Sequence, residues 1–235
     1  MTEDARPRRR FLQALALVPA STLAGGTAAH GAQAAMDPDA AGETYEPKYF
    51  TEEEWAFVNA AVDHLIPADE HGPGALAACV PEFIDRQMQD AYGHGKLWYM
   101  QGPFHPEVDA TYGHQLSLVP RDIYRHGIAS CNTWCRQQHG KVFAELDGGV
   151  REQVLKDLES GKIELDAVPA KTFFSFLLNN TKEGFLSDPQ YGGNRGMVGW
   201  KMIGFPGARG DFADWSGQYN VKYPYGPVSI SGEKG

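Results

Sequence analysis

Hydrophobic positions in the middle of the chain recur with the spacing of amphipathic helices. Thr51 and Glu54 have the spacing of a capping box, in which each side chain bonds the other residue's backbone N–H. The apolar positions that follow lie on one helical stripe and stop before a proline: Trp55, Val58, Val62, Leu65 and Ile66. The pattern predicts a helix that begins at Thr51, ends before Pro67 and packs one face against a core.

The same periodicity predicts further helices as far as residue 184. Their expected spans are 81–92, 120–139, 143–146, 150–160 and 169–184. Asp147 is a possible N-cap of the fourth span, Gly161 ends it, and Gly184 closes the last one. No stretch alternates between apolar and polar residues as a half-buried strand does. We therefore expect an all-α domain of five or six helices over residues 51–187.

Residues 188–207 interrupt the helical pattern. The segment is rich in glycine and proline but also carries Tyr191, Trp200 and Phe205. Gly-Gly adopts positive φ without strain and Asp-Pro favours a turn, so neither a helix nor a regular strand is expected here. Large aromatic residues instead indicate an ordered, irregular segment whose shape is fixed by packing. The alternative is a surface loop that these aromatic residues attach to its own domain.

Residues 208–235 are expected to stay irregular, with aromatic residues between glycines, prolines and polar residues. Rigid aromatic side chains at this density are typical of interface anchors. We therefore expect residues 188–235 to dock on a partner protein, although a tail that packs back over its own helices is the alternative. The candidate docking residues are Tyr191, Gly192, Gly193, Asn194, Arg195, Trp200, Lys201, Phe205 and Trp215.

The N-terminus has the pattern of a twin-arginine export signal. Arg8 and Arg9 precede Phe11 and Leu12, and a short apolar run and a small-residue cleavage site at 32–34 follow. An uncleaved membrane anchor is the alternative, but the run is short and contains Pro19. The sequence thus predicts a signal peptide over residues 1–34 and a flexible arm over residues 35–50.

The charge distribution excludes one class of partner. The formal net charge is −9, yet residues 1–34 hold four arginines against two acidic residues, so the rest of the chain is more acidic still. Such a body repels phosphate backbones, and nucleic-acid binding is not expected.

The sequence shows no catalytic centre or cofactor motif. Cys79, Cys131 and Cys135 match neither the haem-attachment motif nor an iron–sulfur ligand set. Cys131 and Cys135 lie four residues apart on one helical face, where a mutual disulfide is geometrically poor, so either could instead bridge to Cys79 or to a partner. Glycine-rich dinucleotide motifs, a phosphate-binding loop and a serine nucleophile motif are also missing.

Three histidines leave a second class of function open. His94, His105 and His114 are spaced by 11 and 9 residues, whereas zinc ligands normally include a close pair. The alternative function is therefore a self-contained exported metalloenzyme that uses these histidines.

Several motifs resemble one protein family. The run from Asp188 to Arg195, Asp-Pro-x-Tyr-Gly-Gly-Asn-Arg, is followed by Gly-Trp-Lys at 199–201 and Gly-Phe-Pro-Gly at 204–207. Together with Gly-Pro-Phe at 102–104 and Tyr-Gly-His-Gln-Leu at 112–116, this order is similar to the gluconate 2-dehydrogenase subunit 3 family.

The resemblance implies the non-catalytic small subunit of a heterotrimeric sugar or sugar-acid dehydrogenase. It implies that FAD is bound by a large subunit of the glucose–methanol–choline type and haem c by a multihaem cytochrome c subunit, with no cofactor on this chain. Together with the signal, it implies that the twin-arginine export machinery carries the large subunit out with this chain. The complex is then expected in the periplasm, associated with the cytoplasmic membrane.

Overall fold

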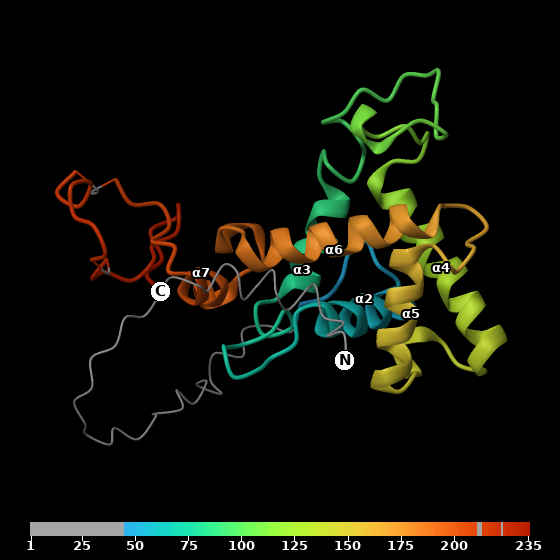
Figure 1. Cartoon of the computed structure of the whole chain (residues 1–235), viewed down its shortest axis with the longest axis horizontal. Helices are drawn as coiled ribbons and strands as arrows, with labels where there is room; N and C mark the ends of the chain where they lie inside the picture. Colours follow the sequence, from blue (N-terminus) through green and yellow to red (C-terminus); the bar gives the residue numbers. More distant parts are fainter. Residues whose placement is uncertain (1–44, 211–212, 222) are drawn as a thin grey trace, which may run out of the picture. The chain divides into compact units, whose positions relative to one another are not determined.

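The computed structural model describes residues 45–210, 213–221 and 223–235. The described residues contain six α-helices and no β-strand, which confirms the expected all-α fold (Figure 1). The helices are α2 (Glu52–Leu65), α3 (Val80–Gln89), α4 (Pro120–His139), α5 (Gly148–Ser160), α6 (Ala170–Leu186) and α7 (Val198–Ile203). Residues 47–235 form one compact unit. The predicted signal peptide lies outside the described residues, and the proposed domain boundary at residue 187 stays a prediction.

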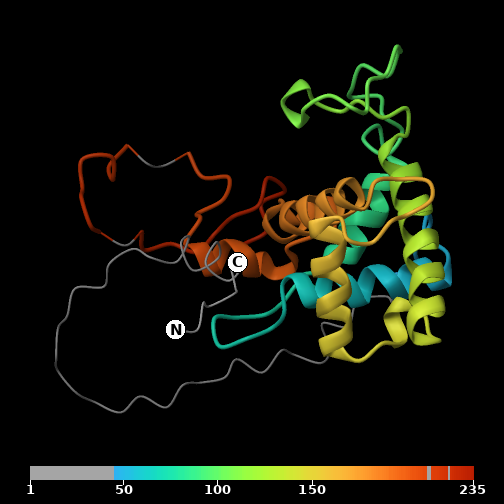
Figure 2. The same ribbon diagram turned by 45° about the vertical axis from the view of Figure 1, so that its right-hand side comes forward.

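Helix α6 is the central element of this unit. It contacts α2, α3, α4, α5 and α7, and it lies along the middle of the helices in Figures 1 and 2. Its apolar face is buried through Phe173, Leu177 and Phe185. Because burial of such side chains contributes about 1.5–3 kcal/mol each, the packing around α6 is a major source of the stability of the unit.

The start of α2 agrees with the sequence prediction. The Glu54 backbone N–H donates to Thr51 Oγ1 at 3.4 Å, and the Thr51 N–H donates to Glu54 Oε2 at 2.9 Å. Both halves of the capping box are therefore present. Phe57, Val58 and Val62 form part of the buried face of the helix.

The segment that enters α2 is anchored to two other helices. The fully buried carboxylate of Asp85 on α3 accepts the backbone N–H groups of Lys48, Tyr49 and Phe50 at 2.9, 3.0 and 3.0 Å. The Tyr49 ring also lies beneath the guanidinium groups of Arg121 and Arg125 on α4, at 4.9 and 4.5 Å from its centroid. Residues 48–50 thus have a fixed path across the helical unit.

Two helix ends and one helix cap differ in detail from their predictions. Helix α3 ends at Gln89, before Tyr92. Helix α6 continues through Gly184 and ends at Leu186. Gly184 is a packing residue, because a Cβ there would lie 2.8 Å from Phe83 Cδ1 on α3. Asp147 occupies the N-cap position of α5 but its side chain makes no capping hydrogen bond, whereas Gly161 ends the helix with φ 73° as expected.

The prediction that residues 188–207 contain no helix is wrong. Six of them form α7, between two short turns of 3-10 helix and Gly204. Gly196 and Gly204 adopt φ of 64° and 69°, and Met197, with φ 55°, occupies the position before the first helical turn. Residues in the left-handed conformation thus stand at both ends of α7 and limit it to six residues. A helix this short does not repeat its apolar stripe, so the sequence pattern does not predict it.

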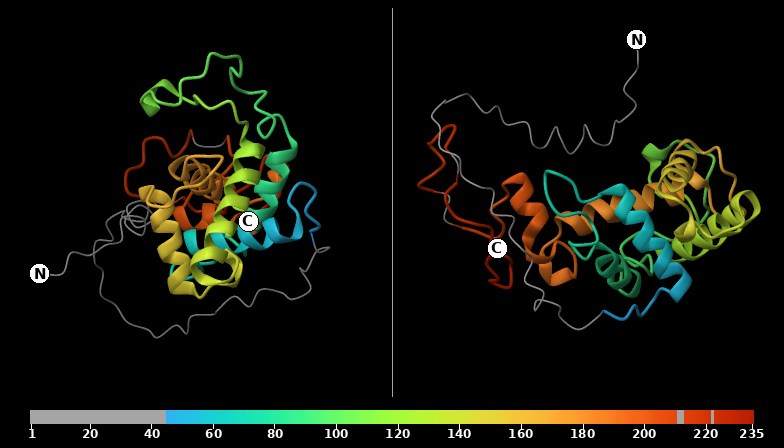
Figure 3. Two further views of the ribbon diagram at one scale, coloured as in Figure 1. Left: turned by 90° about the vertical axis from the view of Figure 1, so that its right-hand side faces the viewer. Right: turned by 90° about the horizontal axis from the view of Figure 1, so that it is seen from below.

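The middle of the loop formed by residues 96–118, between α3 and α4, projects from the helices, as Figure 3 shows. Nearer its ends, Trp98 and His114 pack against Phe176 of α6, each at 5.9 Å between ring centroids. This loop contains one turn of 3-10 helix at Ala110–Tyr112 and exposes Leu97, Tyr99 and Tyr112. Among the described helices, none has the length and apolar content needed to cross a membrane.

Candidate docking site

The glycine-rich segment, residues 188–207, is held against the end of α6 by the side chains of Asn194 and Trp200. Asn194, which is fully buried and left-handed with φ 47°, donates from Nδ2 to the Ser187 carbonyl and accepts from the Gly199 N–H, both at 2.8 Å. Trp200 donates from Nε1 to the Leu186 carbonyl at 2.7 Å. The carbonyl groups of Leu186 and Ser187, at the end of α6, therefore accept hydrogen bonds from the segment, and these bonds fix its position on the helix.

Two glycines make this close approach possible. A Cβ at Gly193 would lie 2.2 Å from the Gly184 carbonyl oxygen, and a Cβ at Gly199 would lie 2.1 Å from the Phe185 carbonyl oxygen. Both distances are too short for any side chain. Glycine is required at these positions because the backbone touches α6 directly.

Residues 227–235 also bind this segment. Asp188 accepts the Gln190 N–H at 3.2 Å with one carboxylate oxygen and the Ile230 N–H at 2.7 Å with the other. The Ala208 N–H donates to the Val228 carbonyl at 2.7 Å, and the Val228 N–H donates to the Pro206 carbonyl at 3.2 Å. The intervening loop, residues 208–226, is therefore closed at its base.

Arg195 connects the segment to α3. Its guanidinium donates to Glu82 Oε2 at 3.0 Å, while Arg86 pairs with the other oxygen of the same carboxylate. The Glu82 side chain is only 8% exposed, whereas those of Arg86 and Arg195 are 45% and 55% exposed. A nearly buried carboxylate thus orients two arginines at the surface.

The predicted docking residues fall into three groups by exposure. Gly192, Gly193, Asn194 and Trp200 are buried inside the chain, where they fix the path of the backbone. The exposed ones are Tyr191, Arg195, Lys201 and Phe205. Trp215 is half-buried and lies edge-on to Tyr223, at 5.6 Å between ring centroids.

The loop 208–226 carries its own aromatic cluster. The Arg209 guanidinium donates to the Gly226 carbonyl and lies over the rings of Tyr223 and Tyr225, at 5.7 and 5.3 Å. Tyr219 is almost fully exposed. The described part of the loop therefore presents aromatic rings on a closed base.

All three cysteines are free thiols in the structure. Cys131 and Cys135 are buried in the core, and a hydrogen bond between the two thiols, together with burial, raises the pKa of Cys131 well above its usual value. Cys79 is half-buried next to Arg195 and Glu82, and burial raises the pKa of its thiol although Arg195 opposes this effect. A disulfide to a partner stays a prediction.

The three histidines have separate surroundings. His94 contacts the Arg121 guanidinium at 2.7 Å, His105 contacts Glu107 at 3.0 Å, and His114 contacts the Leu118 carbonyl at 2.8 Å. In the part of the chain that the structure describes, no three His, Cys, Asp or Glu side chains are grouped as metal ligands. The metalloenzyme alternative therefore stays a prediction.

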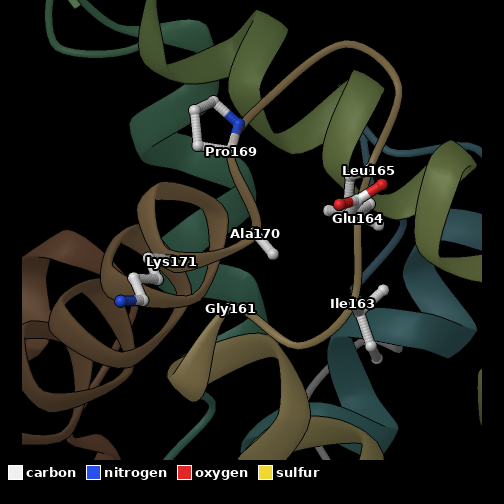
Figure 4. Close-up of a pocket in the computed structure, with 7 residues that line it drawn as sticks. All are labelled: Gly161, Ile163, Glu164, Leu165, Pro169, Ala170 and Lys171. Atoms are coloured by element: carbon white, nitrogen blue, oxygen red, sulfur yellow. The ribbon is translucent and has the colours of Figure 1, made fainter. Parts of the chain in front are cut away.

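One hollow lies between α5 and α6, and Figure 4 shows its lining at the connection between these helices. It has a volume of about 410 Å³, and the ionisable residues in its lining are Glu164 and Lys171. The other lining residues are Gly161, Ile163, Leu165, Pro169 and Ala170.

Of the three residues that form the ion pairs at the start of α3, Glu82, Arg86 and Arg195, sequence reasoning missed Glu82 and Arg86. The only local signal for them is their opposite charge at a spacing of four on one helix face. The contact between Glu82 and Arg195, which lie 113 residues apart in the sequence, has no local signal at all.

These features define a helical protein that carries a rigid glycine-rich segment at the end of its central helix. A family model described as gluconate 2-dehydrogenase subunit 3 matches residues 52–207, which is about two thirds of the chain. The chain therefore belongs to the gluconate 2-dehydrogenase subunit 3 family, as its motifs predicted. Comparisons with curated proteins and with solved structures gave no match.

Proposed function

We propose that this chain is the non-catalytic small subunit of an FAD-dependent sugar or sugar-acid dehydrogenase complex. Membership of the subunit 3 family carries the proposal, because the family name denotes one subunit of a multisubunit dehydrogenase. The matched region includes the rigid segment at residues 188–207, which exposes Tyr191, Arg195 and Phe205. Exposed aromatic and arginine side chains on a rigid backbone favour protein binding.

In this proposal the reaction takes place in the partner subunits. The large subunit, of the glucose–methanol–choline type, binds FAD and oxidises the substrate, and a multihaem cytochrome c subunit passes the electrons to the membrane. The small subunit stabilises the flavoprotein and escorts it through the twin-arginine export machinery to the periplasm. The sequence pattern Arg8-Arg9-x-Phe11-Leu12 supports the escort role, because the twin-arginine route accepts cargo that is already folded.

Replacing both signal arginines by lysine, Arg8→Lys with Arg9→Lys, tests the escort role. The double variant should keep both subunits in the cytoplasm, bound to each other and able to reduce a soluble dye with the sugar substrate. Cell fractionation followed by a dye-reduction assay measures this outcome. Arg10→Lys is the matched control, because residue 10 is the variable position of the pattern, and it should leave export unchanged.

The outcome also separates escort from docking. Arrival of the flavoprotein in the periplasm of cells that carry the double variant would disprove the escort role and leave a docking role. If the small subunit never co-purifies with a flavin-containing protein, the proposed function itself is wrong.

A further inference from the structure

We propose that Tyr191, Arg195 and Arg86 form a binding patch for a carboxylate side chain on the flavoprotein subunit. This patch, called the arginine patch below, includes Glu82 as the residue that orients the two arginines. The proposal rests on the proposed function, and it specifies which surface of the chain meets the partner and what chemistry that surface recognises.

The first argument is the orientation of the arginines. Arg86 comes from α3 and Arg195 from the glycine-rich segment, and each guanidinium binds a different oxygen of Glu82. Because the Glu82 side chain is nearly buried, its carboxylate holds both arginines from below while about half of each side chain stays exposed. An arginine that is already oriented loses less conformational freedom when it binds a partner.

The second argument is the backbone around the arginine patch. Gly192 has φ 96°, and a Cβ at this position would lie 2.8 Å from Arg86 Cδ and 3.3 Å from Glu82 Cγ. On the other side, the Arg195 N–H donates to the Ala78 carbonyl at 3.2 Å, just before α3. The segment is therefore pressed onto the start of α3, and this contact fixes the places of Tyr191 and Arg195 relative to Arg86.

The third argument is charge complementarity. A planar guanidinium offers parallel N–H donors that match the two oxygens of a carboxylate. Since the chain has a net charge of −9, an acidic partner surface is repelled by most of it and is attracted at the arginine patch. The same net charge disfavours a polyanion such as nucleic acid, so a protein carboxylate is the ligand that we assign.

Tyr191 completes the arginine patch with an apolar contact. Its side chain is 49% exposed, and it immediately precedes the glycine that touches Arg86. Tyrosine and arginine, together with tryptophan, are enriched among the residues that dominate binding energy at interfaces. We therefore assign the partner surface as a carboxylate beside an apolar residue.

The test measures the affinity of the full chain for the purified FAD-containing large subunit at increasing NaCl concentrations. Arg195→Gln and Tyr191→Ala should each weaken binding on the order of 30-fold, and Arg195→Gln should also flatten the salt dependence. Arg195→Lys, which keeps the charge but loses the planar donors, should have an intermediate affinity. The matched control is Arg136→Gln, which removes one charge from an exposed ion pair with Glu53 on other helices. It should bind as the wild type does.

The outcomes separate a failure of the arginine patch from a failure of the proposed function. Wild-type binding that neither Arg195→Gln nor Tyr191→Ala weakens would overturn the arginine patch and leave the subunit role intact. Failure of the wild-type chain to bind the flavoprotein would overturn both. Should Arg195→Gln unfold the chain, as circular dichroism would show, Tyr191→Ala decides the question, because the Tyr191 side chain is 49% exposed and lies outside the buried core.

Discussion

At the scale of single residues, Asn194 explains why the glycine-rich segment is rigid. One carboxamide supplies both a donor and an acceptor, and asparagine tolerates the left-handed conformation better than most residues with a side chain. Here the Nδ2 group donates to the partly buried Ser187 carbonyl, and Oδ1 accepts the buried Gly199 N–H. The side chain thus joins the end of α6 to the start of α7.

Replacing this residue should reduce stability strongly. Asn194→Ala leaves two polar backbone groups without their partner, and we expect a loss of about 2–3 kcal/mol in the free energy of unfolding. Urea denaturation of the wild type and the variant measures it. Asn179→Ala, on the exposed side of α6, is the control and should change stability by less than about 0.5 kcal/mol. Equal effects of the two variants would contradict the bracing role of Asn194.

What could be predicted at this scale depends on distance along the chain. The capping box of Thr51 and Glu54 was predictable because its two members are three residues apart. The composition of residues 188–207 indicated an ordered segment, but composition does not predict which of its side chains are buried. Trp200 is buried against the end of α6, where its Nε1 donates to the Leu186 carbonyl, and this contact exists only in the folded chain. Tyr191, from the same segment, is exposed.

At the scale of elements, hydrophobic periodicity predicted the long helices and failed for the short one. Helices α2, α4 and α6 span about four to five and a half turns, so their apolar stripes repeat enough times to be recognised. Helix α7 has six residues, and left-handed residues at 197 and 204 define its ends. Gly184 shows the reverse problem, because a glycine that suggests a helix end is a packing residue inside α6.

Two helical glycines should respond to alanine in opposite directions. Gly127 on α4 packs against α6, where a new Cβ would lie 2.2 Å from Phe173 Cδ2, so Gly127→Ala should cost about 1–3 kcal/mol. Gly149 in α5 has no atom within 4 Å of a new Cβ, so Gly149→Ala should stabilise by about 0.5 kcal/mol. Thermal unfolding followed by circular dichroism compares them. A stabilised Gly127→Ala would show that α4 and α6 are not closely packed there.

At the scale of the whole molecule, residues 227–235 close the loop 208–226 through contacts with residues 188–208. Asp188 is central to this closure, because it accepts hydrogen bonds both from its own turn and from Ile230. The Asp188 carboxylate therefore supplies part of the hydrogen bonding that joins residues 227–235 to the turn after α6.

Releasing that carboxylate should expose the loop to proteases. With Asp188→Ala, limited trypsin digestion should cleave at Arg209 several times faster, while the far-ultraviolet dichroism of the helices stays nearly unchanged. Asp109→Ala is the matched control, because Asp109 also accepts a local N–H, from Thr111 at 2.9 Å, but holds no distant segment. Equal cleavage rates at Arg209 in both variants would show that Asp188 does not close the loop.

The anchoring of residues 48–50 has a mechanical consequence for the proposed export. A pull on the preceding residues reaches the backbone at Lys48, and it meets three hydrogen bonds to Asp85 and the aromatic contacts of Tyr49 before it reaches α2. Bonds that are loaded together resist force better than bonds that break in succession. The tension is therefore passed to α3 and α4, and α2 is protected from being unwound from its first turn. Traction on the leader would then draw the helical unit along in its folded form.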